Sequence, residues 1–387
     1  MPDLHSDQLG LLLCLSYYHP HVSGLSISAA EIAEEFTRRG HRAMVVCSSR
    51  PGLARREAIN GVEVTRSHTI GQVGKAPLMP LHGIDIWQAA KHADIVALHL
   101  PYPDAAIAAI MAKLRRRKLI ISYAASISRA DWISRVTRAL AGLSHLVAGM
   151  LADRIQVVSQ EYADNSTFCR LFRQKLCYAP PPTPFPSHEA IGHSRCRPNP
   201  HGPLHIGYVG RLARQKSLNL LLEAFKGLPE LMQREVVLDL CGPAVDVVGE
   251  EDWRQTLEIA ENSGGLIRYH GVLPRSELDA FYAKLDLLVL PSTDRQESFG
   301  LVQVEAMLQG VPVVASNLPG MREPVRQTGM GLLAKPGDPD DLRNCIAQVL
   351  RAGPPALVDP QQLRKLFGPD VSCAPFFELA AHQNIAL

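Results

Sequence analysis

The stretch LPSTDRQESFGLVQVEAMLQGVPVVASNLPG, which runs from Leu290 to Gly320, contains the strongest pattern in the chain. It predicts a buried strand that ends near Leu290, a polar loop, a helix, and a second strand over 311–315. The loop carries Glu297 and the helix carries Glu305, with seven residues between the two acids. The pattern indicates one strand–helix–strand unit of a parallel α/β sheet, with an acid on each side of the helix start.

The join between this loop and helix is formed by Phe299, Gly300 and Leu301. Backbone N–H groups at a helix start have no partner within the helix and carry a partial positive charge. At the carboxyl edge of a parallel sheet, such helix starts bind phosphate groups in many α/β proteins. The sequence therefore predicts an anion site at this join.

The bulk composition limits the class of protein. A chain of 387 residues is longer than one ordinary core, so we expect two domains. The hydrophobic content of 46% is typical of a globular protein, and the formal net charge of +2 gives no reason to expect a nucleic-acid partner. The eight cysteines include no Cys-x-x-Cys pair, which predicts buried thiols rather than zinc ligands or disulfides. We expect a cytoplasmic protein, because no signal-peptide pattern is visible and no apolar run reaches about 18 residues.

The order of predicted elements indicates the domain organisation. Apolar strand-like runs alternate with helical patterns in both halves, which predicts parallel, doubly wound sheets. Residues 179–203 are dense in proline, which neither a helix interior nor a central strand tolerates. We predict an N-terminal Rossmann-like domain over 1–178, a linker over 179–203, a C-terminal Rossmann-like domain over 204–358, and a tail and helix over 359–387. We expect the last segment to pack back on the first domain.

Two cations, Arg211 and Lys216, lie in one loop that follows the first strand of the second domain and starts at Gly210. Arginine can bind a phosphate through two parallel hydrogen bonds, lysine acts as a point charge, and glycine lets a ligand approach the backbone. The loop therefore predicts a diphosphate site, to which the helix start at Gly300 would contribute. The alternative is a solvated basic loop without a ligand.

The acids have a functional and a plain interpretation. We expect Glu305 about two turns into its helix, beyond the amides that would hold a phosphate. There it could accept hydrogen bonds from two ribose hydroxyls, or it could be an ordinary helix-surface acid. Glu297 precedes the helix, where it either faces a ligand hydroxyl or caps the helix start. In the first domain, Gly24 lies in the loop after the first strand and either lets a phosphate approach or serves as a turn residue.

Taken together, these motifs resemble the retaining family-4 glycosyltransferases. The segment ESFGLVQVE, residues 297–305, matches the family's acid-x7-acid signature, and Gly210-Arg211-Leu212 with Lys216 matches its phosphate loop. Other motifs follow in the family's order: Leu290-Pro291-Ser292, Gly310-Val311-Pro312-Val313, Pro319-Gly320, Gly329-x-Gly331-Leu332-Leu333 and Pro336-x-Asp338. The resemblance is strong over 204–350 and fainter in the first half. It implies the GT-B fold, in which two Rossmann-like doubly wound domains face a central cleft.

The resemblance also implies a role for each motif. The residues so assigned are Gly210, Arg211, Lys216 and Gly24 for the donor diphosphate, Glu305 for the donor ribose, and Glu297, Phe299, Gly300 and Leu301 for the donor sugar and catalysis. The implied reaction transfers a hexosyl or N-acetylhexosaminyl group from a nucleotide-diphosphate sugar with retention of anomeric configuration. No cofactor and no metal are implied, because the two cations and the helix dipole would offset the charge of the leaving diphosphate.

The chain departs from the family pattern on the acceptor side. Where many relatives have a histidine after the strand predicted at 119–123, this chain has Ala124, whose side chain can neither donate a hydrogen bond nor transfer a proton. The usual Gly-Gly of the first loop is Ser23-Gly24, and three prolines at 180–182 stand where relatives often have Asn-Gly or Tyr-Gly. Three residues could take the place of the missing histidine, and for each the alternative is a loop or core residue: His99, Ser126 and His19.

The sequence therefore predicts a retaining glycosyltransferase that uses a nucleotide sugar and a saccharide or polyprenyl-linked acceptor, in polysaccharide or glycolipid synthesis. Residues 129–150 are apolar with basic residues at the front, which indicates either peripheral contact with the inner face of a membrane or a buried domain helix. Because of Ala124, the alternative function is a catalytically impaired relative that binds a nucleotide sugar or acts as a scaffold subunit. An NAD-dependent enzyme is disfavoured, since no Gly-x-Gly-x-x-Gly follows a predicted strand.

Overall fold

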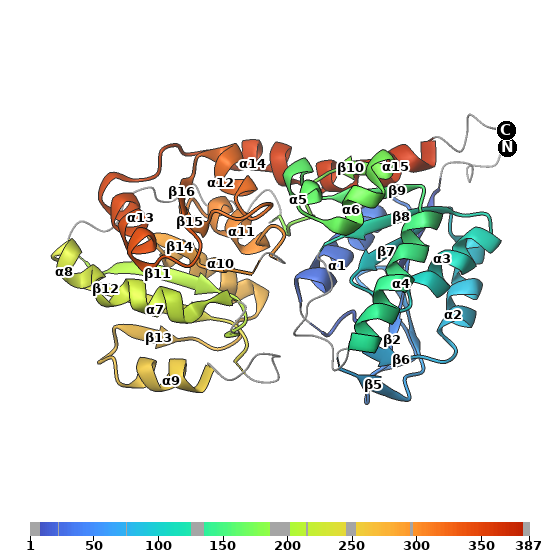
Figure 1. The fold of residues 1–387 in the computed structure, drawn as a ribbon, viewed down its shortest axis with the longest axis horizontal. Helices are drawn as coiled ribbons and strands as arrows, with labels where there is room; N and C mark the ends of the chain where they lie inside the picture. Colours follow the sequence, from blue (N-terminus) through green and yellow to red (C-terminus); the bar gives the residue numbers. More distant parts are fainter. Residues whose placement is uncertain are drawn as a thin grey trace. The chain divides into compact units, whose positions relative to one another are not determined.

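A computed structural model describes residues 8–21, 23–74, 76–124, 135–185, 202–213, 216–244, 253–294 and 297–381 (Figure 1). The chain divides into two compact units. The first comprises Met1–Pro182 and Pro369–Leu387, and the second comprises Thr183–Gly368. The first boundary lies inside the proline-rich segment predicted as a linker, of which 186–201 lie outside the described residues.

The first unit contains an eight-stranded sheet, whose order among the described residues is β10-β9-β8-β7-β1-β2-β4-β3. Neighbouring strands are parallel except for β3 and β4. Its central strands are buried along their length, as expected where helices cover both faces of a parallel sheet. The strands are β1 (Gly10–Cys14), β2 (Arg42–Ser48), β3 (Arg56–Ile59), β4 (Val62–Ser67), β7 (Ile95–Leu100), β8 (Lys118–Tyr123), β9 (Arg154–Val157) and β10 (Leu176–Tyr178), with a separate hairpin of β5 (Gly71–Val73) and β6 (Ala76–Leu78).

Helices cover both faces of this sheet. One face shares a core with α1 (Gly24–Arg38) and α15 (Pro369–Ala381), which lies last in the described chain. The opposite face is covered by α2 (His82–Ala89), α3 (Ala105–Leu114), α4 (Arg135–Leu151), α5 (Gln160–Asp164) and α6 (Thr167–Leu171), with short 3-10 turns at η1 (Ala90–His92) and η2 (Arg173–Lys175). Residues from both ends of the sequence therefore build one domain.

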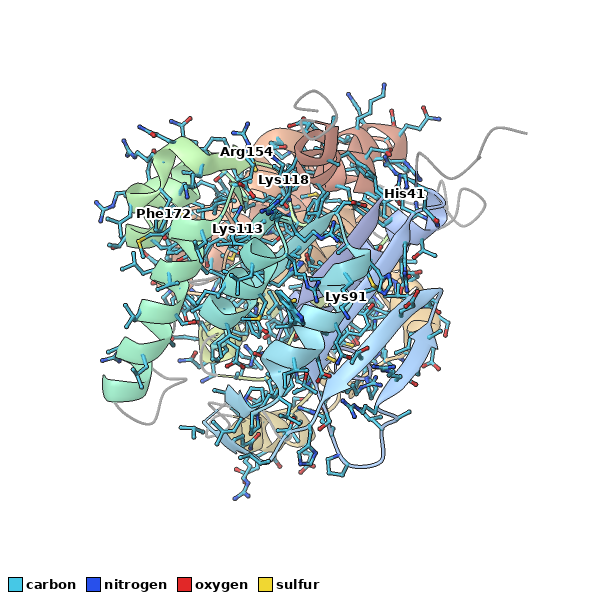
Figure 2. The ribbon with its side chains drawn as sticks, turned by 90° about the vertical axis from the view of Figure 1, so that its right-hand side faces the viewer. His41, Lys91, Lys113, Lys118, Arg154 and Phe172 are labelled. Atoms are coloured by element: carbon cyan, nitrogen blue, oxygen red, sulfur yellow. The ribbon has the colours of Figure 1, made fainter. Side chains whose placement is uncertain are left out.

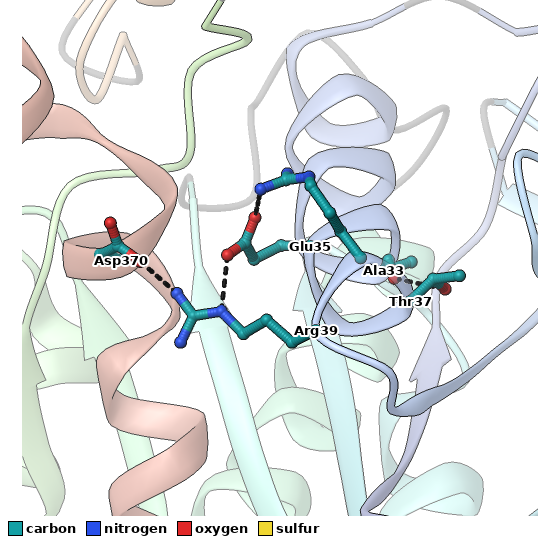
Figure 3. Close-up of polar contacts among 6 residues, drawn as sticks. Ala33, Glu35, Thr37, Arg39 and Asp370 are labelled. Carbon is teal, nitrogen blue, oxygen red and sulfur yellow. Dashed lines mark hydrogen bonds and ion pairs between the residues drawn. The ribbon is translucent and has the colours of Figure 1, made fainter. Parts of the chain in front are cut away.

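The contact between α1 and α15 is both aromatic and ionic. Phe36 of α1 stacks on Phe377 of α15, with ring centroids 4.5 Å apart. Arg39 donates through Nε to Glu35 Oε1 at 2.6 Å and forms an ion pair with Asp370 (Figure 3). The Glu35 carboxylate is nearly buried, so its cationic partner reduces the cost of removing it from water. These contacts hold α15 on the first unit.

The second unit is a six-stranded parallel sheet, whose order among the described residues is β13-β12-β11-β14-β15-β16. Its strands are β11 (Leu204–Val209), β12 (Val236–Cys241), β13 (Ile267–Tyr269), β14 (Leu287–Leu290), β15 (Val313–Ser316) and β16 (Gly331–Ala334). Its helices are α7 (Leu218–Lys226), α8 (Leu228–Met232), α9 (Trp253–Glu261), α10 (Arg275–Lys284), α11 (Leu301–Leu308), α12 (Glu323–Thr328), α13 (Pro339–Ala352) and α14 (Pro360–Phe367). The segment predicted as one tail over 359–387 is thus shared, because α14 belongs to this unit and α15 to the first.

Candidate active site

The predicted phosphate loop turns away from β11 at Gly210. This residue has a φ of 157° and donates its N–H to the carbonyl of Cys241 at 2.9 Å. A side chain here would come within 3.1 Å of the hydroxyl of Tyr208, which donates to the carbonyl of Arg211 at 2.7 Å. The loop therefore stays close to the carboxyl ends of β11 and β12, where a phosphate could approach its backbone.

Two loops that are far apart in the sequence meet next to Lys216. Its ammonium group forms an ion pair with Glu297, and both side chains are largely buried, at 19% and 17% exposure. Beside this pair, Ser217 Oγ lies 2.7 Å from Thr293 Oγ1, and the Thr293 amide donates to Ser217 Oγ at 3.2 Å. The loops meet because β11 and β14 are neighbours in the sheet. The structure thus brings together the cationic and acidic loops of the predicted site.

The start of α11 is held by several close contacts. Gly300 precedes the helix with a φ of 74°, and a side chain there would come within 2.5 Å of Leu290. The buried Gln303 donates to the carbonyl of Phe299 at 2.7 Å and to that of Met321 at 2.9 Å. Phe299 itself is buried against the ring of Phe367. The first amides of α11 are therefore held in place beside Glu297, as a preorganised anion site requires.

Glu305 is the fifth residue of α11, little more than one turn from its start, which corrects the expected depth. Its side chain is only 6% exposed, so it is not a surface acid. Arg275 donates to one carboxylate oxygen at 2.8 Å and Tyr282 donates to the other at 2.8 Å. Burial keeps the pKa of Tyr282 well above its ordinary value, so this hydroxyl remains a donor. A carboxylate offers about four acceptor positions, so each oxygen can still accept from a ribose hydroxyl; that role stays a prediction.

A second polar cluster borders a cavity of about 570 Å³ beside α10. Asp239 lies between two histidines, with His205 Nδ1 at 2.8 Å and His270 Nε2 at 2.7 Å from its two oxygens. The hydrogen bond to Asp239 raises the pKa of His205. Burial raises the pKa of Asp239, but the hydrogen bonds from both histidines outweigh it, so that this pKa is lowered. None of the predicted donor-site residues lines this cavity.

The candidates in the first unit are more dispersed. Gly24 is the first residue of α1 rather than a loop residue, and Ser23 caps that helix by accepting from the Ser26 amide at 3.2 Å. A side chain at Gly24 would meet no atom within 4 Å, so a ligand has room to approach it. Ala124 follows β8 and is partly buried. The carbonyl of His19 accepts from Arg66 at 2.8 Å, while Ser126 lies outside the described residues.

His99 is fully buried in β7, and neither ring nitrogen has a hydrogen-bond partner among the described residues. Burial lowers the pKa of His99 to about 4. Ser122 of β8 and Gln156 of β9 lie beside it in register, and each also has a buried oxygen without a partner in the described part of the chain. Gln156 donates to the carbonyl of Ser372 in α15 at 3.0 Å. His99 thus belongs to a buried polar row under α15, and its predicted acceptor-side role stays a prediction.

The positive charges of the predicted diphosphate site come from Arg211, Lys216 and the start of α11. In the stretches that the structure describes, no group of three or more His, Cys, Asp or Glu side chains is arranged to hold a metal ion. The expectation that the reaction needs no metal stays a prediction.

Solved structures show which fold this is. The structure of Anabaena Alr3699/HepE in complex with UDP and glucose aligns with a TM-score of 0.73 at 19% identity, over 97% of this chain and 100% of that one. The sucrose-phosphate synthase (tll1590) from Thermosynechococcus elongatus aligns with a TM-score of 0.72 at 18% identity, over 98% and 100%. With its two Rossmann-like domains, the chain has the GT-B fold of the glycosyltransferases.

Sequence comparison then identifies the family. The pattern of Glycosyltransferase Family 4 matches residues 22–215, and that of glycosyl transferases group 1 matches residues 194–362. The chain belongs to glycosyltransferase family 4. A 2-deoxystreptamine glucosyltransferase of Streptomyces kanamyceticus is 33% identical over 165 residues, which are 42% of this chain and 40% of that enzyme. A D-inositol 3-phosphate glycosyltransferase of Corynebacterium urealyticum is 36% identical over 151 residues, 38% of this chain and 34% of that one. The chain therefore matches less than half the length of these relatives.

Sequence reasoning missed the partners of the predicted acids. Arg275 and Glu305 are 30 residues apart and lie on different helices, so no local spacing connects them. The bridge between His205, Asp239 and His270 likewise joins residues of three separate chain segments. The sequence did contain one sign of the second cluster. Asp239 lies inside the apolar strand-like run VVLDLC, and a carboxylate buried in a strand needs a hydrogen-bond partner.

Proposed function

We propose that this protein transfers a sugar from a nucleotide-diphosphate donor to a saccharide hydroxyl. The observation that carries the proposal is the Lys216–Glu297 pair, which joins the loop of Arg211 to the start of α11. A diphosphate bound there would meet two cations and the free amides of a helix. The structural neighbours in complex with UDP and with UDP-glucose support a nucleotide sugar as the class of donor.

In the proposed reaction, the bond between the anomeric carbon and the diphosphate oxygen breaks, and a bond from that carbon to the acceptor oxygen forms. The acceptor hydroxyl loses its proton, and the diphosphate leaves with added negative charge. Arg211, Lys216 and the dipole of α11 would offset this charge. The resemblance to retaining enzymes supports retention of configuration, a hexosyl or N-acetylhexosaminyl donor, and a reaction without a metal.

The ion pair suggests how donor binding would rearrange the site. Lys216 is bound to Glu297 in the structure, so a diphosphate would compete with Glu297 for the ammonium group. The released carboxylate could then accept a hydrogen bond from a hydroxyl of the donor sugar. Glu305, oriented by Arg275 and Tyr282, would accept from the ribose.

We place the acceptor among saccharides and polyprenyl-linked saccharides, and the reaction in polysaccharide or glycolipid synthesis at the inner face of a membrane. Exposed apolar side chains on α4 support a setting near lipid: Leu140, Leu143 and Met150.

Thermal stabilisation by a panel of UDP-, GDP- and ADP-sugars tests the proposal most directly. A ligand that binds only the folded protein stabilises it according to its concentration relative to Kd, so one nucleotide class should raise Tm above the others. The matching donor should then be consumed in a transfer assay with saccharide acceptors. No stabilisation by any nucleotide sugar would argue against a donor site.

Replacing both cations, Arg211→Ala with Lys216→Ala, should lower transfer by about 10²–10³-fold or more, because preorganised charges at a leaving group contribute several kcal/mol to the rate. Lys226→Ala is the matched control, since Lys226 is an exposed lysine on α7 of the same unit. A double variant with the activity of the control would remove these residues from the mechanism.

A second candidate function is a nucleotide-sugar-binding or scaffold subunit with impaired catalysis. Two observations favour it: Ala124 stands after β8 where many relatives have a histidine, and the nearby histidine His99 is fully buried. Ala124→His separates the two functions, with Ala124→Ser as the control for added size and polarity. A large gain in transfer only with histidine indicates impairment, whereas no change or a loss indicates a working site with a different set of groups.

A further inference from the structure

The cavity of about 570 Å³ beside α10 is formed where side chains of this helix face those of β11, β12 and β13. Its lining residues all lie between positions 203 and 286, so the second unit forms the cavity alone. The volume is within the range of about 300–1,000 Å³ that small-molecule sites occupy. Because no residue of the predicted donor site lines it, the proposed transfer reaction leaves its polar side chains without a role.

Asp239 of β12 fixes the rings of two histidines on one wall of the cavity. Each of its carboxylate oxygens accepts from one ring, at 2.8 Å from His205 Nδ1 and 2.7 Å from His270 Nε2. Phe281 of α10 lies edge-on to the His270 ring, with ring centroids 5.3 Å apart. Among the described residues, the second nitrogen of each histidine has no hydrogen-bond partner, and the two side chains are 26% and 35% exposed. Two oriented ring nitrogens are therefore available to a ligand.

Two cations border the same cavity: Arg268 of β13 and Lys284 at the end of α10. Within the part of the chain that the structure describes, neither forms an ion pair, and the Arg268 guanidinium donates only to a backbone carbonyl, at 3.1 Å. The hydrogen bond to Asp239 raises the pKa of His205, and the positive charge of Arg268 opposes this rise, so Arg268 lies near that ring. The carboxylates of Asp239 and Asp286, in contrast, already accept hydrogen bonds from other residues of the unit. The groups left for a ligand here are mainly cationic donors, which suits an anion.

The two ends of the cavity differ in chemistry. Asp286, two residues after Lys284, donates its amide to the His205 carbonyl and accepts from the His205 amide, both at 2.8 Å, so the cationic end of α10 adjoins His205. Ser276 and Glu277 line the cavity from the first turn of α10, about 12 Å along the helix from Lys284. A carboxylate there would repel a phosphate, but it accepts hydrogen bonds from hydroxyls, and serine both donates and accepts. The cavity thus has one end for an anion and one for hydroxyl groups.

The helix that forms a wall of this cavity also holds the predicted ribose acid. Arg275 and Tyr282 of α10 donate to the two carboxylate oxygens of Glu305. Their neighbours in the sequence, Ser276 and Phe281, line the cavity. A ligand that bridges α10 and the strands would fix this helix, and with it the two donors to Glu305. Its binding should therefore change the affinity of the donor site for a nucleotide.

In the first unit, cations and a cavity occur separately. Figure 2 shows cations on the side of this unit that faces the viewer: Lys91, Lys113, Lys118 and Arg154. A cavity of about 310 Å³ lies between α2 and α3, but none of the residues that line it is charged, and they include Met79, Trp87 and Met111. This apolar lining does not mark a membrane span, since no helix among the described residues is long and apolar enough to cross a membrane. Beside α10, by contrast, a cavity and unpaired cations coincide.

We propose that the cavity beside α10 is a second ligand site, which binds a hydroxylated phosphate ester of the size of a sugar phosphate and acts through α10 on nucleotide binding. The phosphate lies beside Arg268 and Lys284, and the hydroxyls lie beside Ser276 and Glu277. A phosphate monoester carries a charge of about −1.5 to −2 near neutral pH, which two cations match better than they match a single carboxylate. Binding of the ester does not rest on the proposed function, whereas its effect on the nucleotide does, because that effect passes through Glu305.

Calorimetry on the full chain tests the site with glucose 6-phosphate, mannose 6-phosphate and ribose 5-phosphate. At least one should bind with one molecule per chain and about tenfold or more tighter than inorganic phosphate, while glucose alone should not bind at the same concentrations. Absence of binding for all three esters would overturn the proposal. Glucuronate that binds as tightly as the best ester would overturn the assignment of the anion as a phosphate.

Variants of exposed residues locate the ester. Arg268→Gln with Lys284→Gln should weaken its binding about tenfold or more, while the control, Lys226→Gln with Lys365→Gln, should leave it unchanged. All four side chains are exposed, so both variants should fold, and an unchanged Tm verifies this. If only Arg211→Ala with Lys216→Ala abolishes binding, the ester occupies the predicted donor site and the proposal is wrong.

Glu277→Gln tests the hydroxyl end of the cavity. Loss of the carboxylate should weaken binding of the ester about threefold, because an amide is the weaker acceptor, and should leave inorganic phosphate unaffected or slightly tighter. If the ester and inorganic phosphate gain equally, Glu277 does not contact the hydroxyls, and the proposed orientation is wrong.

The effect on the donor site is measured with the nucleotide that stabilises the protein most. Its affinity should change about fivefold or more when the ester is saturating, and the affinity for the ester should change by the same factor when the nucleotide is saturating. Equal affinities would overturn the action through α10. Ester binding that depends on Arg268 and Lys284 without any nucleotide binding removes the proposed function alone, and nucleotide binding without ester binding removes the second site alone.

Discussion

Two sets of buried polar side chains, one in each unit, are held in opposite ways. In the second unit, Glu305 and Asp239 each accept hydrogen bonds at both carboxylate oxygens. In the first unit, His99, Ser122 and Gln156 form a row in which buried atoms lack partners among the described residues. A buried polar group without a hydrogen bond costs about 1–3 kcal/mol, whereas a satisfied one is close to neutral or slightly stabilising. The carboxylates of Glu305 and Asp239 are therefore already held by hydrogen bonds, whereas the row of His99, Ser122 and Gln156 contains polar atoms that the described part of the protein leaves unsatisfied.

The largest effect should come from breaking the satisfied cluster. Arg275→Leu leaves the Glu305 carboxylate buried without its cation, which should destabilise the protein by about 3 kcal/mol. Glu305→Gln keeps the shape and the hydrogen bond from Tyr282, so it should cost less. Chemical denaturation measures both, and a loss of less than about 1 kcal/mol from Arg275→Leu would mean that Arg275 does not stabilise the carboxylate.

The same variants sharpen the ribose assignment. Glu305→Gln should weaken nucleotide binding in calorimetry even where the protein remains folded, because an amide accepts fewer and weaker hydrogen bonds than a carboxylate. Unchanged nucleotide affinity would leave Glu305 as a purely structural link between α10 and α11.

Acidification should affect the two units in opposite directions. Burial lowers the pKa of His82, His99 and His145 in the first unit to about 4, from an ordinary value of 6.5. The contribution of these neutral histidines to folding stability is present at pH values above their unfolded-state pKa of 6.5, and it is lost as pH falls from there towards 4. Asp104 changes the stability of this unit in the opposite direction, because burial raises its pKa to about 6. The three histidines outnumber it, so we expect the unit to lose stability as pH falls.

In the second unit, the hydrogen bond to Asp239 raises the pKa of His205 above its value in the unfolded chain. The contribution of His205 to folding stability is therefore present below the unfolded-state pKa, and it is lost as pH rises through the folded-state pKa. The lowered pKa of Asp239 means that its own contribution is lost only at still lower pH. Hydrogen exchange at neutral pH and near pH 5, corrected for intrinsic rates, should therefore show opening of β7 and β8 before β11 and β12. Equal loss of protection in both sheets would contradict this order.

The smallest expected effect is at the unsatisfied row. His99→Leu replaces two unpartnered ring nitrogens by an apolar group of similar volume, so we expect a change between neutral and about 1 kcal/mol of added stability. Thermal and urea unfolding measure it, with His82→Leu as the contrast, because His82 is hydrogen-bonded to Ser67 and Tyr102 and its loss should destabilise. If His99→Leu is the more damaging of the two, the ring has partners that its surroundings in the structure do not show.

Local patterns in the sequence were sufficient for the strand–helix alternation and for the two loops of the predicted donor site. Glu297 and the start of α11 could be located because glycine and acids at a strand exit have a direct conformational meaning. The Arg275–Glu305 pair could not, since it depends on how two helices pack. The burial of His99 could not be predicted either. In the sequence this residue lies near the end of an apolar run, where a strand can either reach the surface or continue under a helix. In the structure the strand continues under the face of the sheet to which α15 contributes.

The position of α15 has a consequence for synthesis on the ribosome. Cys373, Phe376 and Leu379 complete the core that β1 and α1 begin, yet they are translated after the entire second unit. The second domain can thus emerge whole while the first still exposes the part of its sheet that α15 later covers. Since domains generally fold as units during synthesis, we expect the N-terminal domain to be the last to reach its native state, reversing the usual order.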